Sequence, residues 1–252
     1  MEFCERINLR NYSLIVPSVS VGNVGQLAVD LLINSLGLKK LCYVWHESVI
    51  PVAGGDPFGN SKTISTGCEV FYSEKLELVV MQIRSGIMRT KSDFPQFLCS
   101  WVKEEGIRQV IILTGSSAHE RRDEQLVGEP LRFIFCPLTP EAERNNAFAR
   151  QWRGFEVKEI HSRDRGTVSG ISYIPGSGIA LKLYRQCVRE KIICSVLIEF
   201  CSDGNNAPDA FKLADYLNDW LKIKETSGIE QWTPPPSWIF LFGPMPPTEI
   251  FN

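Results

Sequence analysis

The sequence predicts an α/β fold, built as a three-layer α/β/α sandwich around a mixed, mostly parallel sheet. Short β-rich apolar runs alternate with helical patterns along most of the chain. The helix expected over residues 26–36 is apolar on almost every side, which favours burial against a sheet. Residues 68–72 and 76–85 flank a short turn and indicate a hairpin, so the sheet must include an antiparallel pair.

The strands are predicted from runs that are rich in β-branched and aromatic residues. They are expected at residues 12–19, 41–45, 68–72, 76–85, 108–115, 131–136 and 192–202. The stretch 51–67 is rich in glycine, proline, serine and threonine and is therefore expected to be a long loop.

The helices are predicted from apolar residues that recur three and four positions apart. The clearest helix covers residues 93–106, where Ser92 or Asp93 can cap the start and Pro95 fits the first turn. Its apolar face comprises Phe94, Phe97, Leu98, Trp101 and Val102. Gly37 is placed to end the helix over residues 26–36. Further helices are expected at 139–152, 177–191 and 206–224.

The chain divides into one α/β domain, residues 1–224, and a C-terminal extension, residues 225–252. The extension holds six prolines, two tryptophans and three phenylalanines. Proline cannot continue a helix or a central strand, yet so many aromatic residues are unusual in a solvated tail. We therefore expect residues 237–243 to pack on the domain, and the last residues to form an extended spacer that ends in a docking segment.

Composition and charge exclude several classes of protein. The 252 residues are 44% hydrophobic and 22% charged, which is typical of a globular protein. The net charge of -2 gives no overall electrostatic attraction to nucleic acid or to an anionic membrane. No run approaches the roughly 20 apolar residues that span a bilayer, and the first ten residues do not resemble a signal peptide. The eight cysteines form no C-x-x-C pair and are expected to be buried, reduced thiols of a cytosolic or nuclear protein.

One loop, "GSSAHERRDEQL", contains residue types that hydrolases use. Ser116, Ser117, His119 and Asp123 stand close in sequence, so an α/β hydrolase or phosphorylase-like enzyme is the alternative hypothesis. The G-x-S-x-G elbow that usually presents such a serine is absent, however. A polar loop at the carboxyl end of a strand is the interpretation that we favour.

Two glycine-rich turns, at residues 21–28 and 174–180, join strands to helices. Neither has the G-x-G-x-x-G spacing or the lysine of a phosphate-binding loop. Such glycines more often serve tight turns and close packing of a helix on a sheet. Cysteine, histidine and carboxylate residues show no metal-ligand spacing. The sequence therefore predicts no catalytic, cofactor-binding or metal-binding residues.

The chain ends in "PPTEIFN", which leaves two large apolar residues beside the terminal carboxylate. Ile250, Phe251 and Asn252 offer two apolar anchors and one negative charge to a pocket that holds a lysine, and capture of a terminal carboxylate is a known recognition mode. The alternative is that this end folds back onto its own domain. The first reading makes these three residues the predicted partner-binding site.

Six stretches, taken in order along the chain, resemble the proteasome assembly chaperones. They are "VPSVSVGNVGQLAVDLLINSLGL", "LCSWVKEEGIRQVIIL", "SS" followed by "RRDEQL", "YIPGSGIALKLY", "FCSDGNNAPDAFKLADYLNDWL" and "PPSWIFLFGPMPP". The resemblance runs from about Val16 to the C-terminus and is weakest between Gly128 and Gly170. It implies a phosphorylase/hydrolase-like α/β/α fold without a cofactor.

The resemblance also implies a function. Members of the family are non-enzymatic chaperones of the cytoplasm and nucleus. The expected role is to form a heterodimer with proteasome assembly chaperone 1, bind proteasome α subunits and promote assembly of the α ring of the core particle. Related tails end in hydrophobic-tyrosine-any and enter pockets between adjacent α subunits. Here Phe251 stands at the tyrosine position, so a hydrogen bond made by that hydroxyl would be lost.

Overall fold

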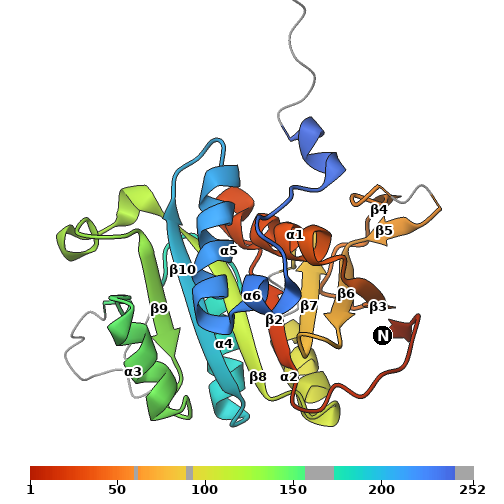
Figure 1. Ribbon diagram of the computed structural model, residues 1–252, viewed down its shortest axis with the longest axis horizontal. Coiled ribbons are helices and arrows are strands. Elements are labelled where there is room, and N and C mark those ends of the chain that lie inside the picture. The colour runs from red at the N-terminus through yellow and green to blue at the C-terminus, as the bar shows by residue number, and fades with distance from the viewer. Residues whose placement is uncertain (60–61, 89–92, 157–172, 242–252) are drawn as a thin grey trace, which may run out of the picture.

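The computed structural model describes residues 1–59, 62–88, 93–156 and 173–241 and shows an eight-stranded sheet between two helical layers (Figure 1). The strand order is β1-β3-β6-β7-β2-β8-β10-β9. These strands are β1 (Glu2–Phe3), β2 (Ser13–Pro17), β3 (Lys39–Tyr43), β6 (Cys68–Ser73), β7 (Leu78–Ile83), β8 (Gln109–Ser117), β9 (Leu131–Phe135) and β10 (Ile193–Cys201). The predicted α/β class is therefore confirmed.

The sheet is mixed, as predicted, but parallel pairing is confined to its centre. Strands β7, β2, β8 and β10 run parallel to one another. Pairing is antiparallel at both edges, where β9 joins β10 and where β1, β3, β6 and β7 follow one another. The prediction of a mostly parallel sheet thus holds only for the centre, because strand periodicity does not report the direction of a partner strand.

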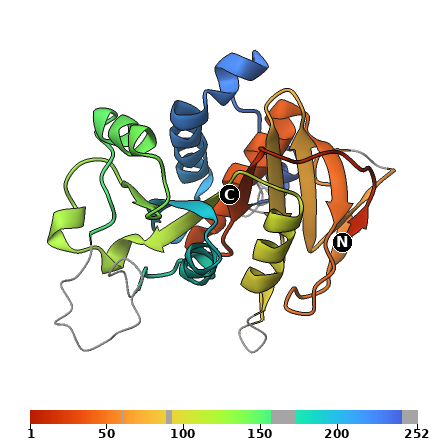
Figure 2. The same cartoon turned by 90° about the horizontal axis from the view of Figure 1, so that it is seen from below.

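Two pairs of helices cover the two faces of the sheet (Figure 2). On one face, α1 (Val24–Leu36) and α5 (Ala207–Leu221) share an apolar core with alternate residues of β8 and β10, such as Leu113 and Leu197. On the other face, α2 (Phe94–Glu104) and α4 (Ala180–Arg189) pack on the intervening residues, such as Ile112 and Val196. Side chains alternate across a strand, so a fully buried central strand is apolar on both faces.

The smaller elements lie at the edges and on the connections. They are the helices α3 (Glu141–Ala149) and α6 (Ile223–Ser227), the strands β4 (Ala53–Gly55) and β5 (Ile64–Thr66), and the 3-10 turns η1 (Val21–Asn23), η2 (Ala118–Glu120), η3 (Asp123–Gln125) and η5 (Pro236–Phe240). Strands β4 and β5 pair as a hairpin, which corrects the expectation of a loop throughout residues 51–67. Small residues such as Gly54 and Gly55 give no alternating apolar pattern, so this strand is seen only in the pairing of its backbone with β5.

Helix α1 is almost wholly apolar, with one buried carboxylate. Asp30 is 6% exposed and accepts hydrogen bonds from both terminal nitrogens of Arg84, at 2.7 and 3.2 Å, and from Gln82 at 2.7 Å. This ion pair links the helix to the end of β7. Helix α2 begins as predicted at Phe94, but the Asp93 carboxylate accepts a hydrogen bond from the Ser48 hydroxyl at 2.8 Å and makes no cap bond.

Candidate functional site

Ligands of α/β proteins usually bind in the crevice beyond the carboxyl ends of the parallel strands. In this chain three segments meet there: the turn after β2, the end of β8 and residues 174–179 before α4. Their backbones are joined directly, because the amide of Val21 donates to the Gly176 carbonyl at 2.9 Å and the amide of Ser117 donates to the Pro175 carbonyl at 3.1 Å. The crevice is therefore filled by the chain's own loops.

Ser18 is the centre of this contact and is fully buried. Its hydroxyl donates to the Ser177 carbonyl at 2.6 Å and accepts the amides of Ile179 and Ala180 at 3.0 and 3.1 Å. The free amides at a helix N-terminus are a common binding place for phosphate and other anions. At the start of α4 the amides of Ile179 and Ala180 already donate to Ser18, which lies about 160 residues earlier in the chain.

The two glycine-rich turns allow this close packing, as the sequence indicated. A Cβ atom on Gly25 would lie 2.4 Å from the carbonyl oxygen of Leu113 in β8. A Cβ atom on Gly178 would lie 1.9 Å from the carbonyl oxygen of Val19. Real Cβ contacts are never so short. These glycines therefore bring backbone against backbone, which is a packing role.

The residues of the hydrolase hypothesis do not form a catalytic arrangement. Ser116 is fully buried, and its hydroxyl donates to the Pro175 carbonyl at 2.9 Å. His119 lies in η2 with 78% of its side chain exposed, and among the described residues it is paired with the carboxylate of Glu120, at 3.9 Å. Asp123 begins η3, and Ser117 ends β8. A serine nucleophile needs its base within hydrogen-bond reach, and no Ser116–His119 bond is found in the described part of the chain.

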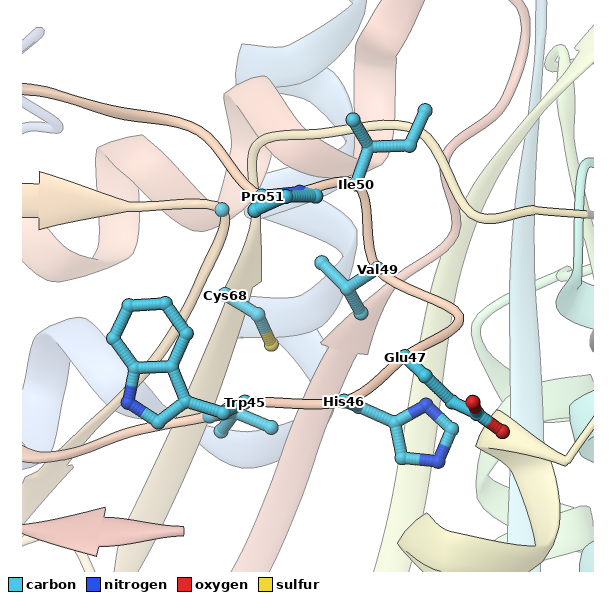
Figure 3. A pocket seen from close by; sticks show the side chains of 9 residues that line it. Trp45, His46, Glu47, Val49, Ile50, Pro51 and Cys68 are labelled. Carbon is cyan, nitrogen blue, oxygen red and sulfur yellow. The ribbon is translucent and has the colours of Figure 1, made fainter.

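A cavity of about 490 Å³ with a largely apolar lining lies beside the end of β3 (Figure 3). Val49 and Cys68 lie near its centre, with Trp45 and His46 on either side. The rim is apolar and accessible, since Trp45 is 55% and Ile50 45% exposed.

This cavity has little catalytic chemistry. His46 Nδ1 accepts the amide of Ser48 at 3.1 Å, so the proton of the neutral ring is on Nε2. The His46 ring packs on Phe97, 4.8 Å between centroids. Burial raises the pKa of the Cys68 thiol far above its ordinary value, which makes it a poor nucleophile.

Neither a metal-binding group of side chains nor a membrane-spanning helix is found among the described residues. No three histidine, cysteine, aspartate or glutamate side chains there are grouped closely enough to hold a metal ion. No described helix has the length and apolar character needed to cross a bilayer. Seven of the eight cysteines are buried, as predicted, and Cys4 is exposed.

The first part of the C-terminal extension lies along α1 and α5. Trp232 is 6% exposed, and its Nε1 donates to the Asp215 carboxylate at 2.8 Å. Lys224 donates to the same carboxylate oxygen at 2.8 Å and lies over the Trp232 ring, 4.8 Å from its centroid. Thr233 is joined to α1 because its amide donates to the Ser35 hydroxyl at 2.7 Å. The extension is thus attached to the domain over residues 232–233.

The predicted partner-binding residues Ile250, Phe251 and Asn252 lie outside the described residues.

Two features were not predicted from the sequence: the buried contact of Ser18 and the exposed side chain of Ile239 in η5. The contact of Ser18 has no local signal, because its partners are distant in sequence. In η5, the periodicity of a five-residue turn is too short to show which side chain points outward.

The sequence of this chain is similar to those of known proteins. A sequence model of the PAC2 family matches residues 14–224. Proteasome assembly chaperone 2 of Danio rerio is 39% identical over 251 residues, which cover 97% of this chain and 96% of the relative. Proteasome assembly chaperone 2 of Homo sapiens is 36% identical over 255 residues, with 97% and 96% covered.

A solved structure shows the same fold at low identity. Pyrococcus furiosus PbaA, an archaeal homologue of proteasome-assembly chaperone, superimposes with a TM-score of 0.64 at 15% identity, over 93% of this chain and 89% of PbaA. The family model covers most of the chain, and the two relatives match nearly all of it. The chain therefore belongs to the PAC2 family.

Proposed function

We propose that this protein is a chaperone of proteasome assembly that works by binding other polypeptides and transforms no substrate. The observation that carries the proposal is the match to relatives named proteasome assembly chaperone 2 over nearly the whole chain. The crevice that would hold a substrate is filled by the chain's own loops, which supports a role in binding. The proposed locations are the cytoplasm and the nucleus.

The proposed active species is a heterodimer with proteasome assembly chaperone 1. It binds proteasome α subunits and promotes assembly of the α ring. Exposed apolar side chains in several places on the chain support contacts with more than one partner, including Trp45, Ile64, Val127 and Ile239.

Within this proposal the C-terminal residues Ile250, Phe251 and Asn252 enter a pocket of the α ring. Burial of the Ile250 and Phe251 side chains would contribute roughly 2–3 kcal/mol each before ordering costs are subtracted. A pocket lysine would pair with the carboxylate of Asn252. Phe251 lacks the hydroxyl of tyrosine, so this tail is expected to bind weakly and to need a second contact.

The test is to measure binding of the purified heterodimer to α subunits or α rings. Removing residues 250–252 is expected to reduce the affinity at least tenfold, because both anchors and the carboxylate are lost together. Replacing Phe251→Tyr is expected to raise the affinity, since a hydroxyl is added.

The control is Glu249→Gln, which changes the charge beside the tail and leaves the three anchor groups in place. Heterodimer formation, measured by co-purification, should be the same for all variants. Equal affinity of the intact and truncated chains would exclude the docking role of the tail. Absence of α-subunit binding by the intact heterodimer would overturn the proposed function itself.

A further inference from the structure

The short turn η5 and the residue that follows it present two large apolar side chains to solvent, directly before residues 242–252. Ile239 is 73% exposed and Leu241 is 44% exposed. Exposed apolar side chains are common singly, but a pair on one ordered turn is a small apolar surface that a partner can cover. We call these two residues the η5 pair.

The η5 turn is held on the domain by contacts on its other side. The Trp238 ring packs at right angles on Phe211 of α5, with 6.2 Å between centroids and an interplanar angle of 86°. The amide of Ser237 donates to the Pro57 carbonyl at 3.3 Å, which joins η5 to the turn after β4. In Figure 1 the turn stands above α1, between α5 and the β4–β5 hairpin. Trp238 faces inward and Ile239 outward, so the η5 pair is presented on an anchored turn.

The internal geometry of η5 supports the same conclusion. The amides of Trp238 and Leu241 donate to the carbonyls of Pro235 and Trp238, at 3.0 and 3.1 Å. Upstream, the contacts of Trp232 and Thr233 attach the chain to α5 and α1. An ordered apolar surface loses little conformational entropy when a partner covers it.

We propose that the η5 pair is a second contact surface for the same proteasome α subunits that receive the C-terminal tail. This inference rests on the proposed function and extends it. The contact is apolar on this side, because none of the five residues of η5 is charged. The partner surface is accordingly an apolar patch on an α subunit, within reach of the pocket that receives the tail.

The length of the chain beyond η5 argues for this partner. Eleven residues follow Leu241, and a fully extended chain spans at most about 3.6 Å per residue. Asn252, the last residue of the predicted docking site, can therefore lie no more than about 40 Å from Leu241. Once the tail occupies a pocket, the η5 pair is held within about 40 Å of that pocket, within reach of the subunits that form it. At the effective concentration set by so short a linker, even a weak second contact strengthens binding.

The test compares Ile239→Asp with a matched control, Leu138→Asp, in the heterodimer. Leu138 is 48% exposed and lies in the turn after β9, at the other end of the strand order from the β4–β5 side. Ile239→Asp is expected to weaken binding to α rings about tenfold, and Leu138→Asp is expected to leave it unchanged. Ile239→Ser should weaken binding in the same direction without adding a charge. Equal thermal unfolding of all chains verifies that the fold is intact.

The measurement is repeated in chains that lack residues 250–252. There, Ile239→Asp is expected to remove most of the remaining affinity, because both contacts are then gone. Unchanged α-ring binding by Ile239→Asp in the full chain would overturn the inference while the proposed function stands. Loss of the heterodimer in Ile239→Asp would assign the η5 pair to the partner chaperone and would also overturn it. If the intact heterodimer binds no α subunits, the inference falls together with the proposed function.

Discussion

Glu199 is a fully buried residue whose two carboxylate oxygens have no hydrogen-bond partner among the described residues. It lies on β10 opposite Leu131 and Gly115, on the face that α5 covers. Burial raises the pKa of Glu199 to about 8, from an ordinary value of 4.5. The proton is therefore retained in the folded state at neutral pH, because a buried charge without a partner is costly.

This pKa shift predicts how stability depends on pH. The unfolded chain releases the proton of Glu199 near pH 4.5, whereas the folded chain keeps it until about pH 8. The stability that this group contributes is fully present below pH 4.5, falls as pH rises and is lost above about pH 8. The slope is at most about 1.4 kcal/mol per pH unit.

Glu199→Gln removes the titrating group and is expected to flatten this dependence, so the variant gains stability over the wild type as pH rises from 5 to 8. Urea unfolding at each pH measures the difference. Glu225→Gln, at a side chain that is 57% exposed, is the control and should follow the wild type. Parallel stability curves for Glu199→Gln and the wild type would show that the carboxyl is already ionised in the folded protein.

At the scale of elements, helix α1 depends on two glycines for different reasons. Gly25 lies where α1 touches the backbone of β8, and a Cβ atom there would lie 2.4 Å from the Leu113 carbonyl oxygen. Gly37 ends the helix in a left-handed conformation, φ 56°, with no atom within 4 Å of an added Cβ. The first glycine is required by packing and the second by backbone conformation.

The two glycines predict unequal effects of alanine. Gly37→Ala is expected to cost about 1 kcal/mol, because only the left-handed conformation is disfavoured. Gly25→Ala is expected to cost roughly 3 kcal/mol, because helix and strand must move apart, which outweighs the better helix propensity of alanine. Urea unfolding of both variants measures these costs. A smaller loss for Gly25→Ala than for Gly37→Ala would show that α1 can shift freely on the sheet.

At the scale of the whole molecule, large apolar side chains are exposed at several separate places. Trp45 and Ile50 border the cavity beside β3, Leu126 and Val127 follow η3, and the η5 pair precedes the tail. Surfaces of this kind usually belong to interfaces with other proteins. In solution the chain is therefore expected to associate, either with itself or with a partner protein that covers these surfaces.

This expectation can be measured with the purified protein. Alone, the chain is expected to self-associate, because apolar surfaces remain in contact with water. Co-expressed with proteasome assembly chaperone 1, it should elute as a 1:1 complex of defined mass. Size-exclusion chromatography with light scattering distinguishes the two states. A chain that is stable and monodisperse alone would contradict the need for a constant partner.

The sequence by itself determined the α/β class, seven of the eight strands of the sheet, the four helices that cover its faces, and the packing role of the glycine turns. These features are local, because an apolar residue every second or every third to fourth position reports which side of one element is buried. The same reasoning proposed Ile250, Phe251 and Asn252 as the partner-binding site, and for these residues it stays a prediction.

Only the tertiary structure decided which strands run parallel, which polar groups are buried and what fills the crevice. Ser18 meets the start of α4 across about 160 residues of chain, and Glu199 is enclosed only when α5 closes over β10. The Ile239 side chain likewise points outward because the neighbouring Trp238 ring packs inward against Phe211. Contacts between residues distant in sequence leave no periodic signal, because they arise from the closing of whole elements on one another.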